Sequence, residues 1–336
     1  MTMTIAPDQT PPSRSGKDQH ANRASWLRRI QGQGLVLVLL ILVVFFTTQS
    51  PYFLTSQNFF SIGSVGSALG IMAIAQTFLI ISGGFDLSVG SVVALTGVTI
   101  GVLYQNGAGI DIWLCALVGL SMGLLVGIVN GVIVVGLKIN ALITTLGTLS
   151  IFSGLAYLLT AGKTLIITSA PFQFLGSGYI GPVPVSMIIF GIVAGIGMFI
   201  ARYTGLGRSI FAIGGNPEAA RLSGIEVPKV QFGLYIASGL SAGLAGLLIT
   251  AQLGASSPQV GANYTLSVVT AVILGGTSLA GGRGSIVGTV LAVTILTVLS
   301  NGFALLQFSS YVQTMALGIV LILAVLLDET VRRLDR

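Results

Sequence analysis

The stretch Ile112–Gly136, IWLCALVGLSMGLLVGIVNGVIVVG, contains no charged residue and places glycine at every fourth position from Gly119 to Gly131. About 20 apolar residues in a helix span the hydrocarbon core of a bilayer, so this stretch is long enough to cross a membrane. Barrel strands would instead alternate apolar and polar residues over about ten positions. The stretch therefore predicts a transmembrane helix.

The rest of the chain has the same character. Of its 336 residues, 53% are apolar and 7% are charged, whereas soluble globular proteins carry about 25% charged residues. This composition excludes a water-soluble fold. Apolar runs separated by glycine, proline or charge predict ten spans, at about 31–48, 60–82, 87–104, 112–136, 139–160, 184–201, 231–252, 264–282, 286–305 and 309–327. We therefore expect an all-α polytopic membrane bundle, with broken helices or re-entrant loops at the glycine-rich segments 83–90 and 275–288.

The charged residues lie mainly between these runs and at the two ends of the chain. With ten spans and a cytoplasmic N-terminus, Lys163 is the only basic residue outside, as the positive-inside rule favours. This predicts a multi-pass membrane protein with a polar cytoplasmic tail over 1–30, a transmembrane domain over 31–327 with its cytoplasmic loop at 202–230, and a second cytoplasmic tail over 328–336. The basic residues of the first tail are too sparse for nucleic-acid binding, so lipid is the expected contact.

Two patterns concern how the spans assemble. Glycines at intervals of four form grooves that let helices approach closely, either within one subunit or between subunits. The segments 79–90 and 272–282 resemble each other, which suggests two halves that each contain a broken helix. The single cysteine, Cys115, excludes an intramolecular disulfide and a cysteine metal site, and the sequence predicts neither a metal nor a cofactor.

Few polar residues lie inside the predicted spans. Asp86, followed by Ser88, is placed at or near the start of a helix, where its carboxylate either caps the helix or belongs to the translocation path or its gate. The neutral amides suit interhelical hydrogen bonds or contacts with a hydroxylated solute. We take the following residues as candidates for the path or gate: Asp86, Ser88, Gln76, Asn130 and Asn301.

The cytoplasmic loop 202–230 predicts a short helix. Asn216 can cap it, Pro217 suits its first position, and Glu218 lies in the first turn, where the helix dipole favours an acid. Gly224 ends it. A helix of two turns is marginal alone, so packing on its own bundle or on a soluble partner must hold it.

Three separated segments carry a family resemblance. Glu218-Ala219-Ala220 followed by Gly224 resembles the loop of bacterial ABC importer permeases whose short helix docks into the ATPase subunit. The segments 207–225, 83–90 (GGFDLSVG) and 275–284 (GGTSLAGGRG) are similar to those of ribose-type monosaccharide permeases, although that family commonly has isoleucine at the position of Phe85. The resemblance runs from about residue 35 to residue 327.

The resemblance implies a transport subunit of the bacterial inner membrane and not an enzyme. It implies a homodimer that works with a cytoplasmic ATPase and an extracytoplasmic sugar-binding protein, and that moves ribose or a related sugar. The ATPase-coupling helix would comprise Asn216, Pro217, Glu218, Ala219, Ala220, Arg221 and Gly224. Two alternatives remain. A secondary transporter would need an embedded carboxylate pair, and only Asp86 is available; a membrane scaffold would need neither a capped cytoplasmic helix nor broken spans.

Overall fold

The computed structural model describes residues 34–106 and 109–334, so the expected tail over 1–30 lies outside the described residues. An apolar helix, Gly34–Gln49, comes first. The helices that follow are α2 (Ser56–Ile81), α3 (Val89–Asn106), α4 (Ile112–Gly131, continued by one π-helical turn, Val132–Gly136), α5 (Ala141–Thr160), α6 (Ala170–Ser177), α7 (Val185–Tyr203), α8 (Gly205–Gly215), α9 (Pro217–Leu222), α10 (Val227–Leu253), α11 (Tyr264–Leu274), α12 (Ile286–Leu305) and α13 (Ser310–Leu334).

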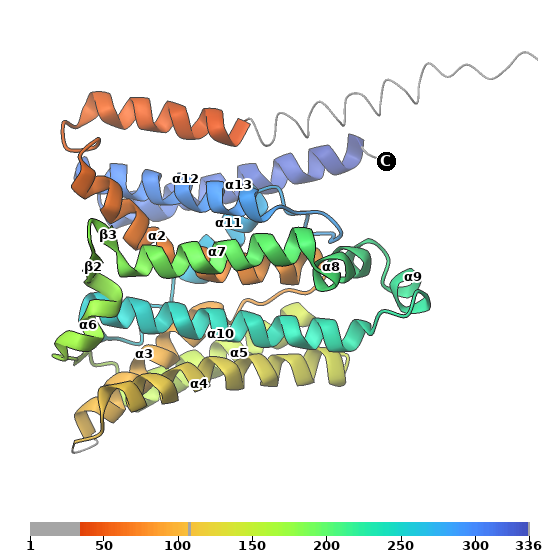
Figure 1. Cartoon of the computed structure of the whole chain (residues 1–336), viewed down its shortest axis with the longest axis horizontal. Helices are drawn as coiled ribbons and strands as arrows, with labels where there is room; N and C mark the ends of the chain where they lie inside the picture. Colours follow the sequence, from red (N-terminus) through yellow and green to blue (C-terminus); the bar gives the residue numbers. More distant parts are fainter. Residues whose placement is uncertain (1–33, 107–108, 335–336) are drawn as a thin grey trace, which may run out of the picture.

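The long helices lie side by side, and short elements cover the two ends of the bundle (Figure 1). At one end, which we call the strand end, β1 (Leu165–Ile166) pairs with β4 (Ala255–Ser256), and β2 (Tyr179–Ile180) pairs with β3 (Val183–Pro184). At the opposite end, which we call the α9 end, α8 and α9 connect α7 to α10. The expected helical membrane fold is confirmed, with these strand pairs as a small addition.

Six of the described helices are long and apolar enough to cross a membrane: α2, α4 with its π-helical turn, α5, α7, α10 and α12. Four shorter apolar helices accompany them, at Gly34–Gln49, α3, α11 and the first part of α13. The count of ten spans therefore stays a prediction.

Several boundaries differ from the predicted ones. The predicted span 264–282 is a helix only as far as Leu274, because the backbone of Gly275 lies against that of Gly288 and Gly276 turns with a φ of +88°. α13 continues to Leu334 into the predicted tail 328–336. The loop 202–230 also contains α8, which its glycines obscured in the sequence; Thr204 caps it, and buried Ile210 and Ile213 hold it on the bundle.

The helices form two inverted repeats. α2 runs from β3 to α8, whereas α10 runs from α9 to β4, so the two are antiparallel. α4 packs on α10 as α12 packs on α2, and α3 touches α10, α4 and α5 as α11 touches α2, α12 and α13. The contacts thus support two related halves, but the sequence paired the wrong segments. The counterpart of the segment 82–88, which follows α2, is the segment 254–263, which follows α10, and not 272–282.

The glycine ladder of α4 is a packing device inside this subunit. Gly123 and Gly127 lie against the backbone of α10 at Gly239, Tyr235 and Ile236. By contrast, Gly191 and Gly195 on α7 have open space where a Cβ would be. The glycines of α4 therefore serve helix packing within one subunit. A role in packing between subunits stays open only for outward-facing glycines.

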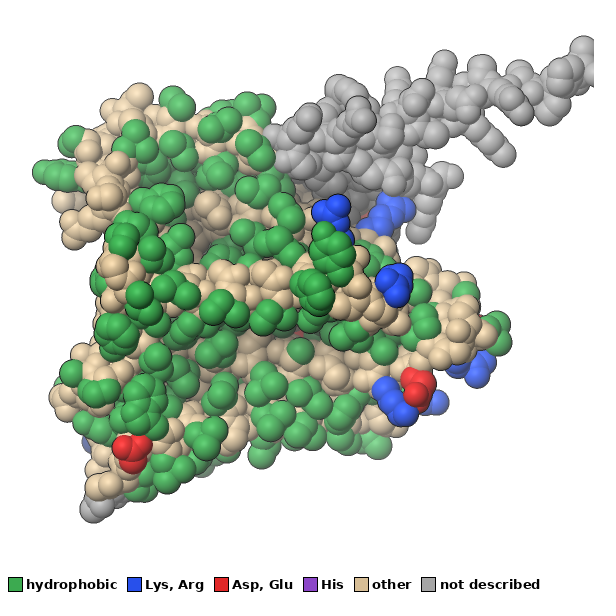
Figure 2. Space-filling model, viewed as in Figure 1, with side chains coloured by type: hydrophobic (Ala, Val, Ile, Leu, Met, Phe, Trp, Pro, Cys, Tyr) green, Lys and Arg blue, Asp and Glu red, His purple; other side chains and the backbone are tan. Residues whose placement is uncertain are grey.

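The basic side chains gather at the α9 end, on the right of Figure 2. Among the residues whose side chains the structure describes, Lys163 follows α5 at the strand end, while the α9 end carries Lys138, Arg202, Arg208, Arg221, Lys229 and Arg283. The asymmetry seen in the sequence is thus a property of the folded molecule.

Candidate functional site

The helical path of the chain is interrupted inside the bundle, where the non-helical segment 82–88 separates α2 from α3. We call this segment the 82–88 break. α2 ends where Gly83 takes a φ of +82°, which L side chains rarely adopt, and the N–H groups of Gly83 and Gly84 bond back to the carbonyls of Ile80 and Leu79. Residues 82–88 are not helical, and α3 starts at Val89. Asp86 and Ser88 are almost completely buried, with Asp86 1% exposed.

Asp86 is the centre of a buried polar cluster. Its Oδ1 accepts hydrogen bonds from the N–H and Oγ–H of Ser88 at 2.9 and 2.6 Å, and its Oδ2 accepts one from Ser238 Oγ at 2.7 Å. The Asn130 amide donates to Ser88 Oγ at 2.8 Å, and Thr148 Oγ1 donates to Asn130 Oδ1 at 2.8 Å. The cluster thus joins the 82–88 break to α4, α5 and α10.

The cluster refines the capping hypothesis for Asp86. The first N–H groups of α3 are not its partners: Val92 N–H bonds to the Ser88 carbonyl, while Asp86 organises the turn just before the helix. Among the described residues, the hydrogen-bond partners of the carboxylate, Ser88, Asn130 and Ser238, all donate to it. The cluster therefore holds the carboxylate in a fixed position.

A polar face of α10 touches the 82–88 break at three successive points. Gln231 Nε2 donates to the Ser82 carbonyl at 3.1 Å, the Tyr235 hydroxyl exchanges two 3.4 Å hydrogen bonds with the backbone of Phe85, and Ser238 reaches Asp86. Positions i, i+4 and i+7 share one helix face. None of these three α10 residues is recognisable in the sequence as part of a site, because one Gln, Tyr or Ser in an apolar helix is an unspecific signal.

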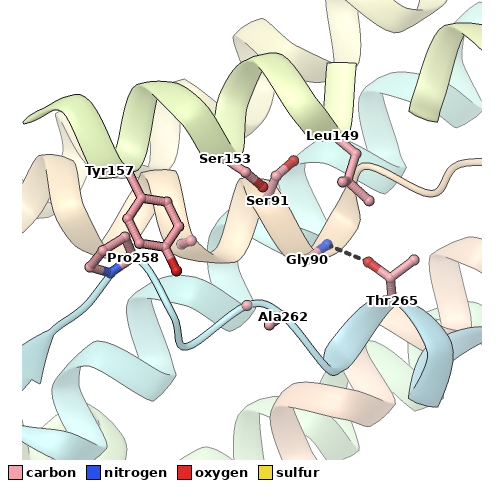
Figure 3. Close-up of a pocket in the computed structure, with 10 residues that line it drawn as sticks. Gly90, Ser91, Leu149, Ser153, Tyr157, Pro258, Ala262 and Thr265 are labelled. Carbon is pink, nitrogen blue, oxygen red and sulfur yellow. Dashed lines mark hydrogen bonds between the residues drawn. The ribbon is translucent and has the colours of Figure 1, made fainter. Parts of the chain in front are cut away.

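A small cavity of about 100 Å³ lies where α3 begins (Figure 3). α3, α5 and the 258–265 segment line it on three sides. Thr265 Oγ1 joins two of these walls by accepting from Gly90 N–H at 3.2 Å and donating to the Leu87 carbonyl at 3.1 Å. Its lining carries no Asp, Glu, Lys or Arg: Gly90, Ser91, Ala94, Leu149, Ser153, Tyr157, Pro258, Gly261, Ala262 and Thr265. We call it the α3 cavity.

The α3 cavity depends on two glycines. The backbones of Gly90 and Gly261 touch, and a Cβ on either would collide with the other's carbonyl oxygen. This contact brings the start of α3 against the segment that leads into α11, so the broken elements of the two repeats meet beside the cavity.

The structure brings together only some of the residues predicted for the path or gate. Asp86, Ser88 and Asn130 form the cluster. Asn301 instead exchanges two amide hydrogen bonds with Asn58, at 3.0 and 2.8 Å. Gln76 is fully buried in α2, and its amide has no hydrogen-bond partner among the described residues.

The short helix predicted after Asn216 is present as α9. Asn216 Oδ1 accepts from the N–H groups of Glu218 and Ala219, both at 3.0 Å, and Gly224 turns the chain with a φ of +84°. Arg221 pairs with Glu218 at 2.6 Å, which lowers the pKa of this exposed carboxyl. The sequence therefore predicted both the cap and the end of this helix.

The two faces of α9 differ in exposure. Ala220 is 4% exposed and packs inward, so it is not part of a surface open to a partner. Leu222 is 77% exposed, and Ala219 and Arg221 are exposed beside it. The outward face of α9 is therefore formed by Glu218, Ala219, Arg221 and Leu222.

Comparison with known proteins gives a consistent picture. Residues 58–325 match the family described as branched-chain amino acid transport system / permease component. The chain is 39% identical to the ribose import permease protein RbsC of Escherichia coli K12, over 90% of this chain and 94% of that protein. It is 38% identical to the Bacillus subtilis RbsC, over 89% of this chain and 93% of that protein. It is 35% identical to the L-arabinose transport system permease protein AraH of E. coli K12, over 96% of this chain and 98% of that protein. No solved structure matches the chain.

Proposed function

The chain belongs to the family of branched-chain amino acid transport system permease components, and we propose that it is the membrane-spanning subunit of an ABC importer for a monosaccharide. The observation that carries this proposal is the identity of 35–39% with ribose and arabinose permeases over about nine-tenths of the chain or more. Membership makes it a transport subunit of the inner membrane and not an enzyme.

The chemistry of the α3 cavity supports a sugar over an amino acid. A zwitterion carries two charges, and burying a charge without a partner is costly. The cavity offers hydroxyl groups from Ser91, Ser153, Tyr157 and Thr265, and no acidic or basic side chain lines it. Such groups match a neutral polyol, and we place the sugar path along this cavity.

The partners follow from the same proposal. A cytoplasmic ATPase would dock on the outward face of α9, a second copy of the chain would complete the path, and an extracytoplasmic sugar-binding protein would deliver the solute at the strand end. The clustering of basic residues at the α9 end supports a cytoplasmic position for that end, with both termini inside.

Transport of labelled solutes tests the proposal. The chain, its ATPase and its binding protein are expressed together, and uptake of ribose, arabinose, other monosaccharides and leucine is measured against cells that lack only this chain. We expect ATP-dependent uptake of one or more monosaccharides and no leucine uptake. Uptake of leucine alone, or of no sugar in the panel, contradicts the proposal.

A further inference from the structure

α10 begins after the short helix α9 and passes the buried break before α3 at about its middle. The segment 223–226 connects α9 to α10, and it is tied down where Ile225 N–H bonds to the Ala220 carbonyl at 3.1 Å. From Val227 to Ser238 the helix rises about 16 Å, which is half the thickness of a bilayer's hydrocarbon core. α10 is thus a continuous rod between α9 and the centre of the bundle.

The contacts of this rod with the 82–88 break are polar and directional. Three side chains of α10 donate hydrogen bonds to the break: Gln231 to the Ser82 carbonyl, Tyr235 to the Phe85 carbonyl and Ser238 to the Asp86 carboxylate. Asp86 accepts from Ser238 with one oxygen and from the Ser88 turn with the other. A shift of α10 along its axis therefore pulls on the residues that start α3.

The start of α3 is also a wall of the α3 cavity. Gly90 and Ser91 line the cavity, and they lie two and three residues after Ser88, whose N–H and hydroxyl group donate to Asp86. The same three residues of α10 are therefore linked to α9 at one end and to the cavity wall at the other.

We propose that Gln231, Tyr235 and Ser238 are positioning residues that couple the position of α9 to the opening of the α3 cavity through the 82–88 break. This rests on the proposed function, since it assumes that α9 receives the movement of an ATPase and that solute passes the cavity. It assigns to Asp86 the role of a fixed anchor, and not that of a group that binds solute or carries a proton.

The test uses Tyr235→Phe and Ser238→Ala, singly and together, because each removes a hydroxyl group and little volume. Ser241→Ala is the matched control, since Ser241 Oγ bonds to the Ser238 carbonyl of its own helix and does not reach the break. The complete complex is reconstituted in vesicles with its ATPase and binding protein, and ATP hydrolysis and sugar uptake are measured together.

We expect the double variant to associate with the ATPase and to hydrolyse ATP, while the number of ATP molecules consumed per imported sugar rises at least tenfold; Ser241→Ala keeps the ratio of the unchanged chain. A purely structural role would lower hydrolysis and uptake together and leave the ratio unchanged, and that result overturns the proposal. Failure of the unchanged complex to import any sugar would instead contradict the proposed function.

A second measurement follows the cavity directly. In a chain with Cys115→Ala, a cysteine at Ser153 reports access to the α3 cavity. We expect its rate of reaction with a small thiol reagent to change at least threefold when a non-hydrolysable ATP analogue is added, and this change to disappear in the Tyr235→Phe, Ser238→Ala background. An equal change in both backgrounds overturns the coupling role.

Discussion

Gly123 of α4 and Gly239 of α10 meet backbone to backbone, so that a Cβ built on Gly123 would lie 2.5 Å from the Gly239 carbonyl oxygen. Real Cβ atoms essentially never come this close to a backbone atom. Two long helices of opposite repeats therefore approach as closely as their backbones allow, and van der Waals packing of this kind drives helix association within a bilayer.

Substituting Gly123 tests this contact. Gly123→Ala forces the two helices apart and is expected to cost about 1–3 kcal/mol through overpacking, seen as a lower thermal midpoint and a lower folded yield in detergent. Gly147→Ala on α5 is the control, because nothing lies within 4 Å of its Cβ position; it should be neutral or slightly stabilising. Equal stability of the two variants would show that α4 does not depend on this contact.

Asp86 gives a second prediction about stability. Asp86→Ala leaves the buried donors of Ser88 and Ser238 without their acceptor, at about 1–3 kcal/mol for each unsatisfied group. Asp86→Asn keeps an acceptor oxygen and should lose less. Thermal unfolding in detergent checks the expected order of stability: the unchanged chain is the most stable, Asp86→Asn is intermediate and Asp86→Ala is the least stable. Ala more stable than Asn would contradict the anchor role.

The sequence predicted local features well and distant contacts poorly. Asn216 and Gly224 mark the two ends of α9 within nine residues, so capping chemistry alone was sufficient. The α10 partners of Phe85 and Asp86 lie about 150 positions away in the chain, and no local pattern connects them. The end of α11 depends on the contact of Gly275 with Gly288 of another helix, which hydropathy cannot detect.

The α3 cavity yields a prediction about transport. Ser153→Leu places a larger apolar side chain in the cavity lining, so we expect sugar uptake to fall at least tenfold with normal insertion. Ser150→Leu is the matched control, because Ser150 is exposed on the same helix and does not line the cavity. Uptake and the amount of protein in the membrane are measured together. If both variants transport equally well, the solute takes another route.

The orientation of the chain can be determined by labelling. In a Cys115→Ala chain, single cysteines at Thr55 and Gln259 lie at the strand end, and one at Ser223 lies at the α9 end; all three positions are exposed. An impermeant thiol reagent added to intact cells should label the first two and spare the third. Labelling of Ser223 alone would reverse the proposed topology.

The last prediction concerns docking on α9. Leu222 is a large apolar side chain exposed at the α9 end, next to Ala219 and Arg221. If this face binds the ATPase, Leu222→Asp should abolish co-purification of the ATPase and sugar uptake without lowering the folded yield. Glu218→Gln should be milder, because the exposed pair with Arg221 is screened by water.

Ala220 provides a contrast to Leu222, because it is buried on the inward face of α9. Ala220→Trp should disturb the packing of α9 on the bundle and lower the thermal midpoint, whereas Leu222→Asp should leave the midpoint unchanged. The two variants thus separate loss of docking from loss of structure. If Leu222→Asp retains both the ATPase and full uptake, the outward face of α9 is an ordinary solvated surface, and the coupling surface must be sought elsewhere at the α9 end.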